Sequence, residues 1–149
     1  MDDKKDIQVL NAIAALIRAD VLDSDGNRAF KQVLTRESNS FDGDPACTVS
    51  IKSSPAEEVM NLANIRNDTY QIKIFVATAK SVRTETAAWD LVQKLQSVVK
   101  DVLDESGYLS GLADILHPVN LIDVIEPVTG SGGNTIAIME VINKRVVVI

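Results

Sequence analysis

The hydrophobic residues between Thr84 and Leu103 recur at the spacing of an α-helix. Its apolar positions form one broad stripe: Ala88, Leu91, Val92, Leu95, Val98, Val99, Val102 and Leu103. Polar positions fall opposite: Asp90, Gln93, Lys94, Ser97, Lys100, Asp101 and Asp104. Glu85 in the first turn and Gly107 after the last match the usual helix-end signals. The segment predicts an amphipathic helix that needs a sheet to pack on, because helices gain most of their stability from packing.

A second amphipathic segment runs from Asp3 to about Val21. Its apolar face consists of Ile7, Leu10, Ile13, Ala14, Ile17 and Val21, with Val9 and Leu16 beside it. Acidic residues stand at its start, where negative charge favours a helix. The residues at 23–27, Asp-Ser-Asp-Gly-Asn, then predict a turn.

Five later segments have the pattern of β-strands. They are residues 30–35, 46–52, 70–77, 119–126 and 135–149. In the second of these, Cys47, Val49 and Ile51 alternate with polar residues and face one way.

Two other segments need separate interpretation. Residues 53–68 fit either a helix that begins at Pro55 or a long hairpin arm, and we favour the arm because the segment leads without a break into the strand at 70–77. Residues 109–116 predict a short helical turn that ends before Pro118.

The element order α-β-β-β-α-β-β predicts an α+β fold in a single domain over residues 1–149. We expect a mostly antiparallel mixed sheet of about five strands, with the two main helices packed on one face. The last strand is apolar on both sides: Ile136, Ile138 and Ile142 face one way and Ala137, Met139 and Val141 the other. Such a strand needs cover on both faces, and left exposed it would promote aggregation. We therefore expect a neighbouring subunit to cover it.

Composition and charge narrow the class of function. The 149 residues are 46% hydrophobic and 24% charged, with a net charge of −6. This balance argues against a surface that grips nucleic acid, which needs clustered Lys and Arg. A lone cysteine, Cys47, predicts a reducing compartment without disulfides. With no apolar leader at the start and no run of about 18 apolar residues, we expect a soluble cytosolic protein with no membrane contact.

Each motif with catalytic or metal-binding potential fails a specific test. A calcium loop counted from Asp23 would have Arg28 in place of its glycine and Leu34 in place of its glutamate. The glycine-rich residues 130–133 precede a strand instead of a helix, so they predict a loop and no phosphate cradle. His117 is the only histidine and has no partner motif. We expect no catalytic residue, no cofactor and no metal, and therefore no enzyme.

Trp89 lies off the centre of the helical stripe. It either caps the rim of the core or protrudes as an interface anchor, a role in which tryptophan is enriched, and the sequence leaves both open. Together with the last strand it completes the predicted subunit interface: Trp89, Ile136, Ile138, Met139, Val147 and Ile149.

The order of these segments resembles that of the tail terminator proteins of long-tailed bacteriophages, which close the top of the tail tube beneath the head. The matching parts are Asp3–Val21, Pro45–Lys52, Tyr70–Ala77, Thr84–Leu103 and Thr135–Val148. The similarity covers nearly the whole chain as an order of elements.

The resemblance implies a structural virion protein of the tail neck, assembled in the host cytoplasm as a homohexameric ring. Its partners would be the tail tube protein on one rim and the head-side connector or stopper protein on the other. DNA would pass through an acidic lumen without specific binding. Candidate lumen or partner contacts are Glu37, Asp42, Asp44, Glu57 and Glu58.

Two alternatives remain open beside the tail terminator. One is a head-closure or connector protein of the same neck region. The other is a non-catalytic binding adaptor that captures a partner strand along an open sheet edge.

Overall fold

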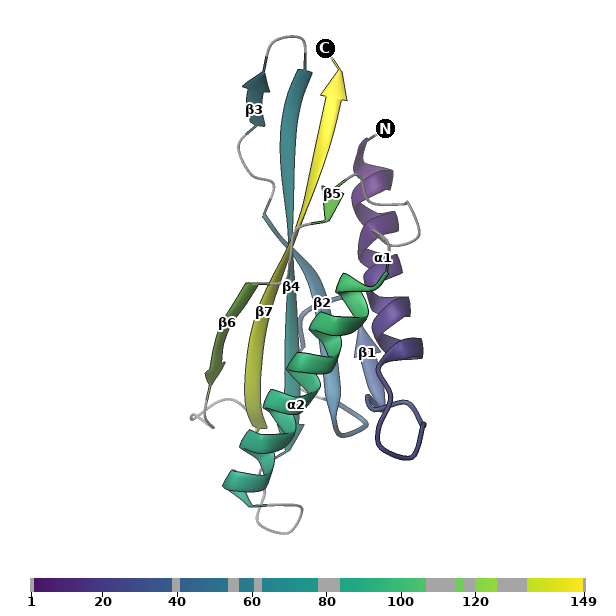
Figure 1. The fold of residues 1–149 in the computed structure, drawn as a ribbon, viewed down its shortest axis with the longest axis vertical. Helices are drawn as coiled ribbons and strands as arrows, with labels where there is room; N and C mark the ends of the chain where they lie inside the picture. Colours follow the sequence, from purple (N-terminus) through teal and green to yellow (C-terminus); the bar gives the residue numbers. More distant parts are fainter. Residues whose placement is uncertain are drawn as a thin grey trace.

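Two long antiparallel strands, β4 (Ala63–Ala77) and β7 (Asn134–Val148), form the centre of the sheet. In the computed structural model they pair along their whole length, from Ala63 opposite Val148 to Ala77 opposite Asn134 (Figure 1). The structure describes residues 2–38, 41–53, 57–60, 63–77, 84–106, 115–116, 120–125 and 134–148.

The other strands extend the sheet from this pair. β2 (Ala46–Ser53) runs antiparallel to β4, and the short β1 (Gln32–Leu34) runs parallel to β2. The order β1-β2-β4-β7 gives a mixed sheet of four strands. β5 (Ile115–Leu116) and β6 (Asn120–Ile125) each pair with β7.

The ambiguous segment after β2 is a hairpin arm. β3 (Glu57–Met60) pairs antiparallel with residues 63–66 of β4. The choice of an arm over a helix is therefore confirmed. The predicted helical turn at 109–116 is wrong at its end, because Ile115 and Leu116 form β5 by pairing with Lys144 and Asn143 of β7. The rest of that segment lies outside the described residues.

The helix predicted at 84–103 is α2 (Glu85–Asp104). It begins at the N-cap Thr84, whose hydroxyl accepts a hydrogen bond of 3.2 Å from the backbone N of Ala87. The predicted stripe is confirmed: Ala88, Val92, Leu95, Val99 and Leu103 are buried, and Leu91, Val98 and Val102 are partly buried against the core. Gln96 is buried among them, which the pattern did not predict.

The N-terminal helix, α1 (Asp2–Asp20), agrees with the prediction except at one end. Its core residues are Val9, Leu10, Ile13, Ala14 and Ile17, and Val21, directly after the helix, joins the same core. Ile7 was predicted to join this face, but it is 52% exposed. It lies at the margin of the stripe, close to the end of α1, and Val9 takes its place in the core.

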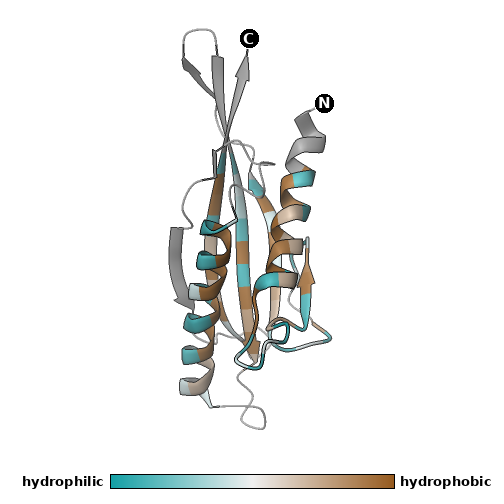
Figure 2. Cartoon of the chain, turned by 45° about the vertical axis from the view of Figure 1, so that its right-hand side comes forward, coloured by the Kyte–Doolittle hydropathy of each residue, from teal (hydrophilic) through white to brown (hydrophobic). Residues whose placement is uncertain are grey.

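Both helices pack on the same face of the sheet, which we call the helix face. Cross-strand partners such as Val49, Ile72 and Met139 share this face and are fully buried. They belong to one hydrophobic core with the inward residues of both helices. Figure 2 shows hydrophobic residues, in brown, on both helices and on the strands behind them. The α+β prediction of two helices on a mixed sheet is confirmed for the order α1, β1, β2, β4, α2, β7.

One predicted core position lies outside this packing. Ile51 shares the side of Cys47 and Val49, as the alternation predicted, but it is 42% exposed. It lies near the end of β2, just before the pairing with β4 shifts its register.

Candidate functional site

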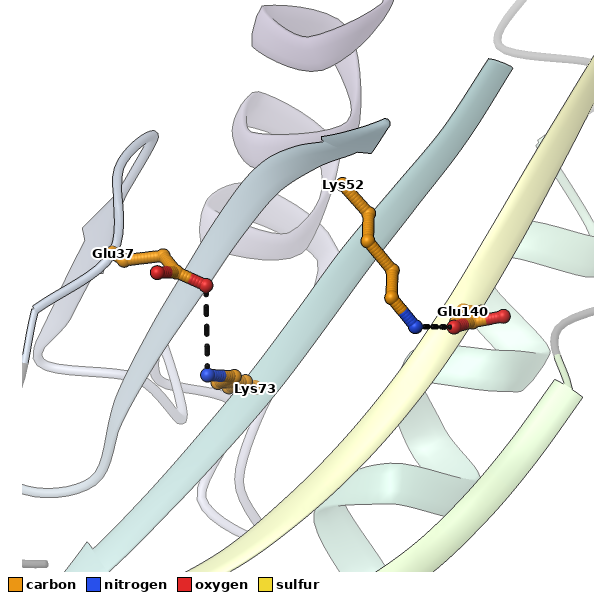
Figure 3. A network of polar contacts seen from close by, with 4 residues as sticks. All are labelled: Glu37, Lys52, Lys73 and Glu140. Carbon is orange, nitrogen blue, oxygen red and sulfur yellow. Dashed lines mark hydrogen bonds and ion pairs between the residues drawn. The ribbon is translucent and has the colours of Figure 1, made fainter. Parts of the chain in front are cut away.

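The sheet has a second face, which neither α1 nor α2 covers. We call it the open face and define it by the side chains that alternate with those of the helix face: Thr48, Ser50, Lys52, Thr69, Gln71, Lys73, Phe75, Ile136, Ile138, Glu140 and Ile142. Figure 3 looks onto this face, with the helices behind the strands.

Two ion pairs cross the open face. Lys52 on β2 reaches over β4, and its Nζ lies 2.5 Å from Oε1 of Glu140 on β7 (Figure 3). Glu37, from the loop after β1, lies with Oε1 3.6 Å from Nζ of Lys73 on β4. Ion pairs this exposed contribute only about 0–1 kcal/mol. The two ion pairs neutralise charge on the open face but do not cover its side chains.

Apolar side chains on the open face gather along β7. Ile136, Ile138 and Ile142 are half-buried in this chain. At one end, Phe75 is covered by the ring of Phe41, with 4.6 Å between ring centroids. The apolar side chains of β7 therefore share this face with the Lys52–Glu140 ion pair, which lies between Ile138 and Ile142.

The structure places the predicted interface residues on different surfaces. Ile136 and Ile138 lie on the open face, as expected. Met139 lies on the helix face and is fully buried in the chain's own core, so it is removed from the predicted interface. Trp89 is half-buried on α2. Val147 pairs with Asn64 near the end of β7, and Ile149 lies outside the described residues.

The acidic candidates lie at opposite ends of β4. Glu37 and Asp42 are exposed in the loop between β1 and β2. Asp44 of the same loop accepts a hydrogen bond of 2.8 Å at Oδ1 from the backbone N of Ala77, so it fastens the last residue of β4. Glu57 and Glu58 lie on β3, beside the first residues of β4. The five residues therefore form no single cluster.

The described residues offer few reactive groups. Burial raises the pKa of the Cys47 thiol well above its ordinary value, which keeps it neutral and unreactive. Within the described ranges, no three His, Cys, Asp or Glu residues are grouped so that they could hold a metal ion. His117 lies outside those ranges. Neither described helix has an apolar stretch that could cross a membrane.

The turn that resembled part of a calcium loop uses its carboxylate internally. Oδ1 of Asp23 accepts hydrogen bonds from the backbone N of Asp25, at 2.9 Å, and of Asn27, at 3.0 Å. Gly26 has a φ of 83°, in the region that favours glycine. The predicted turn is confirmed.

Comparison with protein-family models and with curated protein sequences gives no match. The open face and the arrangement of elements are therefore the grounds for a functional proposal.

Proposed function

We propose that this chain is a structural protein of a bacteriophage tail neck: a tail terminator that caps the head-proximal end of the tail tube as a ring. The observation that carries the proposal is the open face: Ile136, Ile138 and, beyond Glu140, Ile142 share the side of β7 that neither α1 nor α2 covers. A second copy that covers this strip through a different surface makes a heterologous contact, and rotation can close such contacts into a ring. We propose a homohexamer.

The arm supports the same proposal. β3 and the adjoining ends of β4 and β7 extend past the ends of both helices (Figure 1). A sheet that projects in this way has strand edges on which a neighbouring chain can pair. The finer plan α-β-β-β-α-β-β, with β6 and β7 closing the sheet, is the order that resembles the terminator family.

The charge of the chain fits a channel for DNA. The net charge is −6, and Asp42 is an exposed carboxylate on the loop between β1 and β2. A lumen lined by carboxylates repels phosphates and lets a nucleic acid slide. In this proposal one rim of the ring binds the tail tube protein and the other binds the head-side connector. The protein assembles in the host cytoplasm, becomes part of the virion and needs no catalytic group or cofactor.

The test compares two isoleucine-to-lysine changes. We expect the wild type to form rings alone or on tail tubes, seen by light scattering and negative-stain electron microscopy. Ile138→Lys on the open face should raise the protein concentration needed for assembly at least about tenfold, equivalent to roughly 1.4 kcal/mol, while the chain stays folded. Ile7→Lys makes the same change at a 52% exposed position on α1 and should assemble normally.

Three results would contradict the proposal. The first is a wild-type chain that stays monomeric and does not bind tail tubes. The second is assembly of Ile138→Lys at the wild-type concentration. The third is a ring that leaves the length of tail tubes unchanged in vitro. A terminator should stop the elongation of the tube, so this result would favour the alternative, a head-closure protein of the same neck region.

A further inference from the structure

A groove of about 240 Å³ lies in the helix layer, away from the open face. One wall is the flank of α2 that carries Leu91, Lys94, Leu95 and Val98. Their spacing of i, i+3, i+4 and i+7 places them on one side of the helix. The other wall is the chain that follows α1, including Leu22 and Lys31.

Apolar side chains on both walls remain accessible. Leu22 is 45% exposed. Leu91 and Val98 are only partly buried, although they touch the core. An apolar side chain inserted between Leu22 and α2 would remove this surface from water, which is favourable by about 25 cal/mol per Å².

Two lysines flank the same groove. Lys31 and Lys94 are both exposed, and neither forms an ion pair with another described residue. The one carboxylate that also lines the groove, Asp23, already accepts two backbone hydrogen bonds in its own turn. Two lysines against one carboxylate leave the lining of this groove with an excess of positive charge, in a chain whose net charge is −6.

Close packing fixes the wall that carries Lys31. The backbone N of Lys31 donates a hydrogen bond of 2.8 Å to the carbonyl oxygen of Pro45. A methyl group at Gly43 would lie 2.5 Å from Cβ of Lys31, so that loop is packed directly against this residue. A preformed wall loses little conformational entropy when a ligand binds.

We propose that this groove binds a short acidic segment of another protein, with an apolar side chain held between Leu22 and α2 and carboxylates placed on Lys31 and Lys94. The volume is below the ~300–1,000 Å³ of pockets for small molecules. It suits one or two anchoring side chains of a peptide, and the two lysines set the sign of its charge. The inference does not depend on the proposed ring.

The probe for the test is a fluorescein-labelled peptide in which Glu and Leu alternate, titrated with the full chain and followed by fluorescence anisotropy. Lys31→Glu/Lys94→Glu should weaken binding at least about tenfold, because two favourable charge pairs become repulsive. Arg36→Glu/Lys100→Glu has the same net charge, but both of its exposed positions lie outside the groove, so it should bind like the wild type. A Glu/Ser peptide and the Leu22→Ser variant should each bind more weakly, since both lack the apolar anchor.

Four outcomes would overturn the assignment. The wild type could fail to bind the peptide. Both charge variants could lose affinity equally, which would reduce the effect to net charge. The Glu/Ser peptide could bind as well as the Glu/Leu peptide. Finally, sedimentation could show wild-type self-association that only the Lys31/Lys94 variant loses, in which case the occupant is a second copy. Circular dichroism on every variant checks that each is folded.

Discussion

The two faces of this sheet are formed by alternate residues of the same strands, but they have different surroundings. Ile72 on β4 and Ile138 on β7 lie in neighbouring pairs of the same ladder, since Ile72 is opposite Met139 and Lys73 is opposite Ile138. Ile72 is fully buried under the helices, whereas Ile138 is half-buried on the open face. The alternation of the sequence predicts only which side of its strand each isoleucine lies on. The difference in burial between Ile72 and Ile138 therefore comes from what packs on each face. Packing under the helices buries Ile72, whereas neither α1 nor α2 covers Ile138.

The faces also differ in their polar groups. Charges on the open face pair in contact with solvent, as Lys52 does with Glu140. The helix face buries Gln96, whose Nε2 has no hydrogen-bond partner in the described part of the chain. Where the sheet continues toward the arm, Asp68 and Asn143 lie opposite each other and are also buried.

The largest expected effect separates the two isoleucines. Ile72→Ala should lower the free energy of unfolding by about 2–5 kcal/mol, because it leaves a cavity in a closed core. Ile138→Ala should lower it by less than about 1.5 kcal/mol in the monomer, because solvent already reaches that side chain. Urea denaturation measures both. Equal losses would mean that the open face is covered within the chain, and the contrast between the faces would fail.

A smaller effect separates two positions on β2. Cys47 faces the helices and Ser50 faces outward. A thiol reagent near pH 8 should leave Cys47 unmodified in the native chain. In the double variant Cys47→Ala/Ser50→Cys, the new thiol should react at least about 100-fold faster than Cys47 does, because it faces outward. Fast modification of Cys47 would show that the helices open readily.

The same thiol makes stability depend on pH. Its pKa is raised in the folded state, so the folded chain holds this proton where the unfolded chain releases it. The stability contribution is complete below the pKa of the unfolded thiol and falls above about pH 9, by up to roughly 1.4 kcal/mol per pH unit. Comparison with Cys47→Ala isolates this loss; identical pH profiles would argue against a buried neutral thiol.

The smallest expected effect concerns the ion pairs of the open face. A double-mutant cycle on Lys52 and Glu140 should give a coupling of about 0.2–1 kcal/mol, because the side chains are 48% and 20% exposed. High salt should reduce it further. A coupling of several kcal/mol that resists salt would mean that the pair is shielded from water and that the open face is more closed than its exposure indicates.

Part of the candidate site followed from the sequence. Alternation alone placed Ile136, Ile138 and Ile142 on one side of the last strand, and neither of the two described helices covers that side. Met139 was predicted for the same interface because both sides of the strand are apolar. The acidic residues were chosen by charge alone, and charge carries no information about distance. The sequence therefore did not predict that Asp44 and Glu58 lie at opposite ends of β4. The groove was missed, because Lys31 and Lys94 belong to segments that only packing brings together.

By itself the sequence determined the elements of this protein: both helices, the main strands, the turn at Asp23 and the arm in place of a helix. The helices, strands and turn follow from periodicity and local turn chemistry, and the arm follows from the continuity of its segment with the next strand, all of which neighbouring residues specify. The tertiary structure decided which apolar side of β7 the helices cover and that β1 runs parallel to β2. It also decided that Ile7 is exposed and that Gln96 is buried. A periodic pattern shows which residues share a side, but the burial of that side depends on contacts between segments distant in sequence.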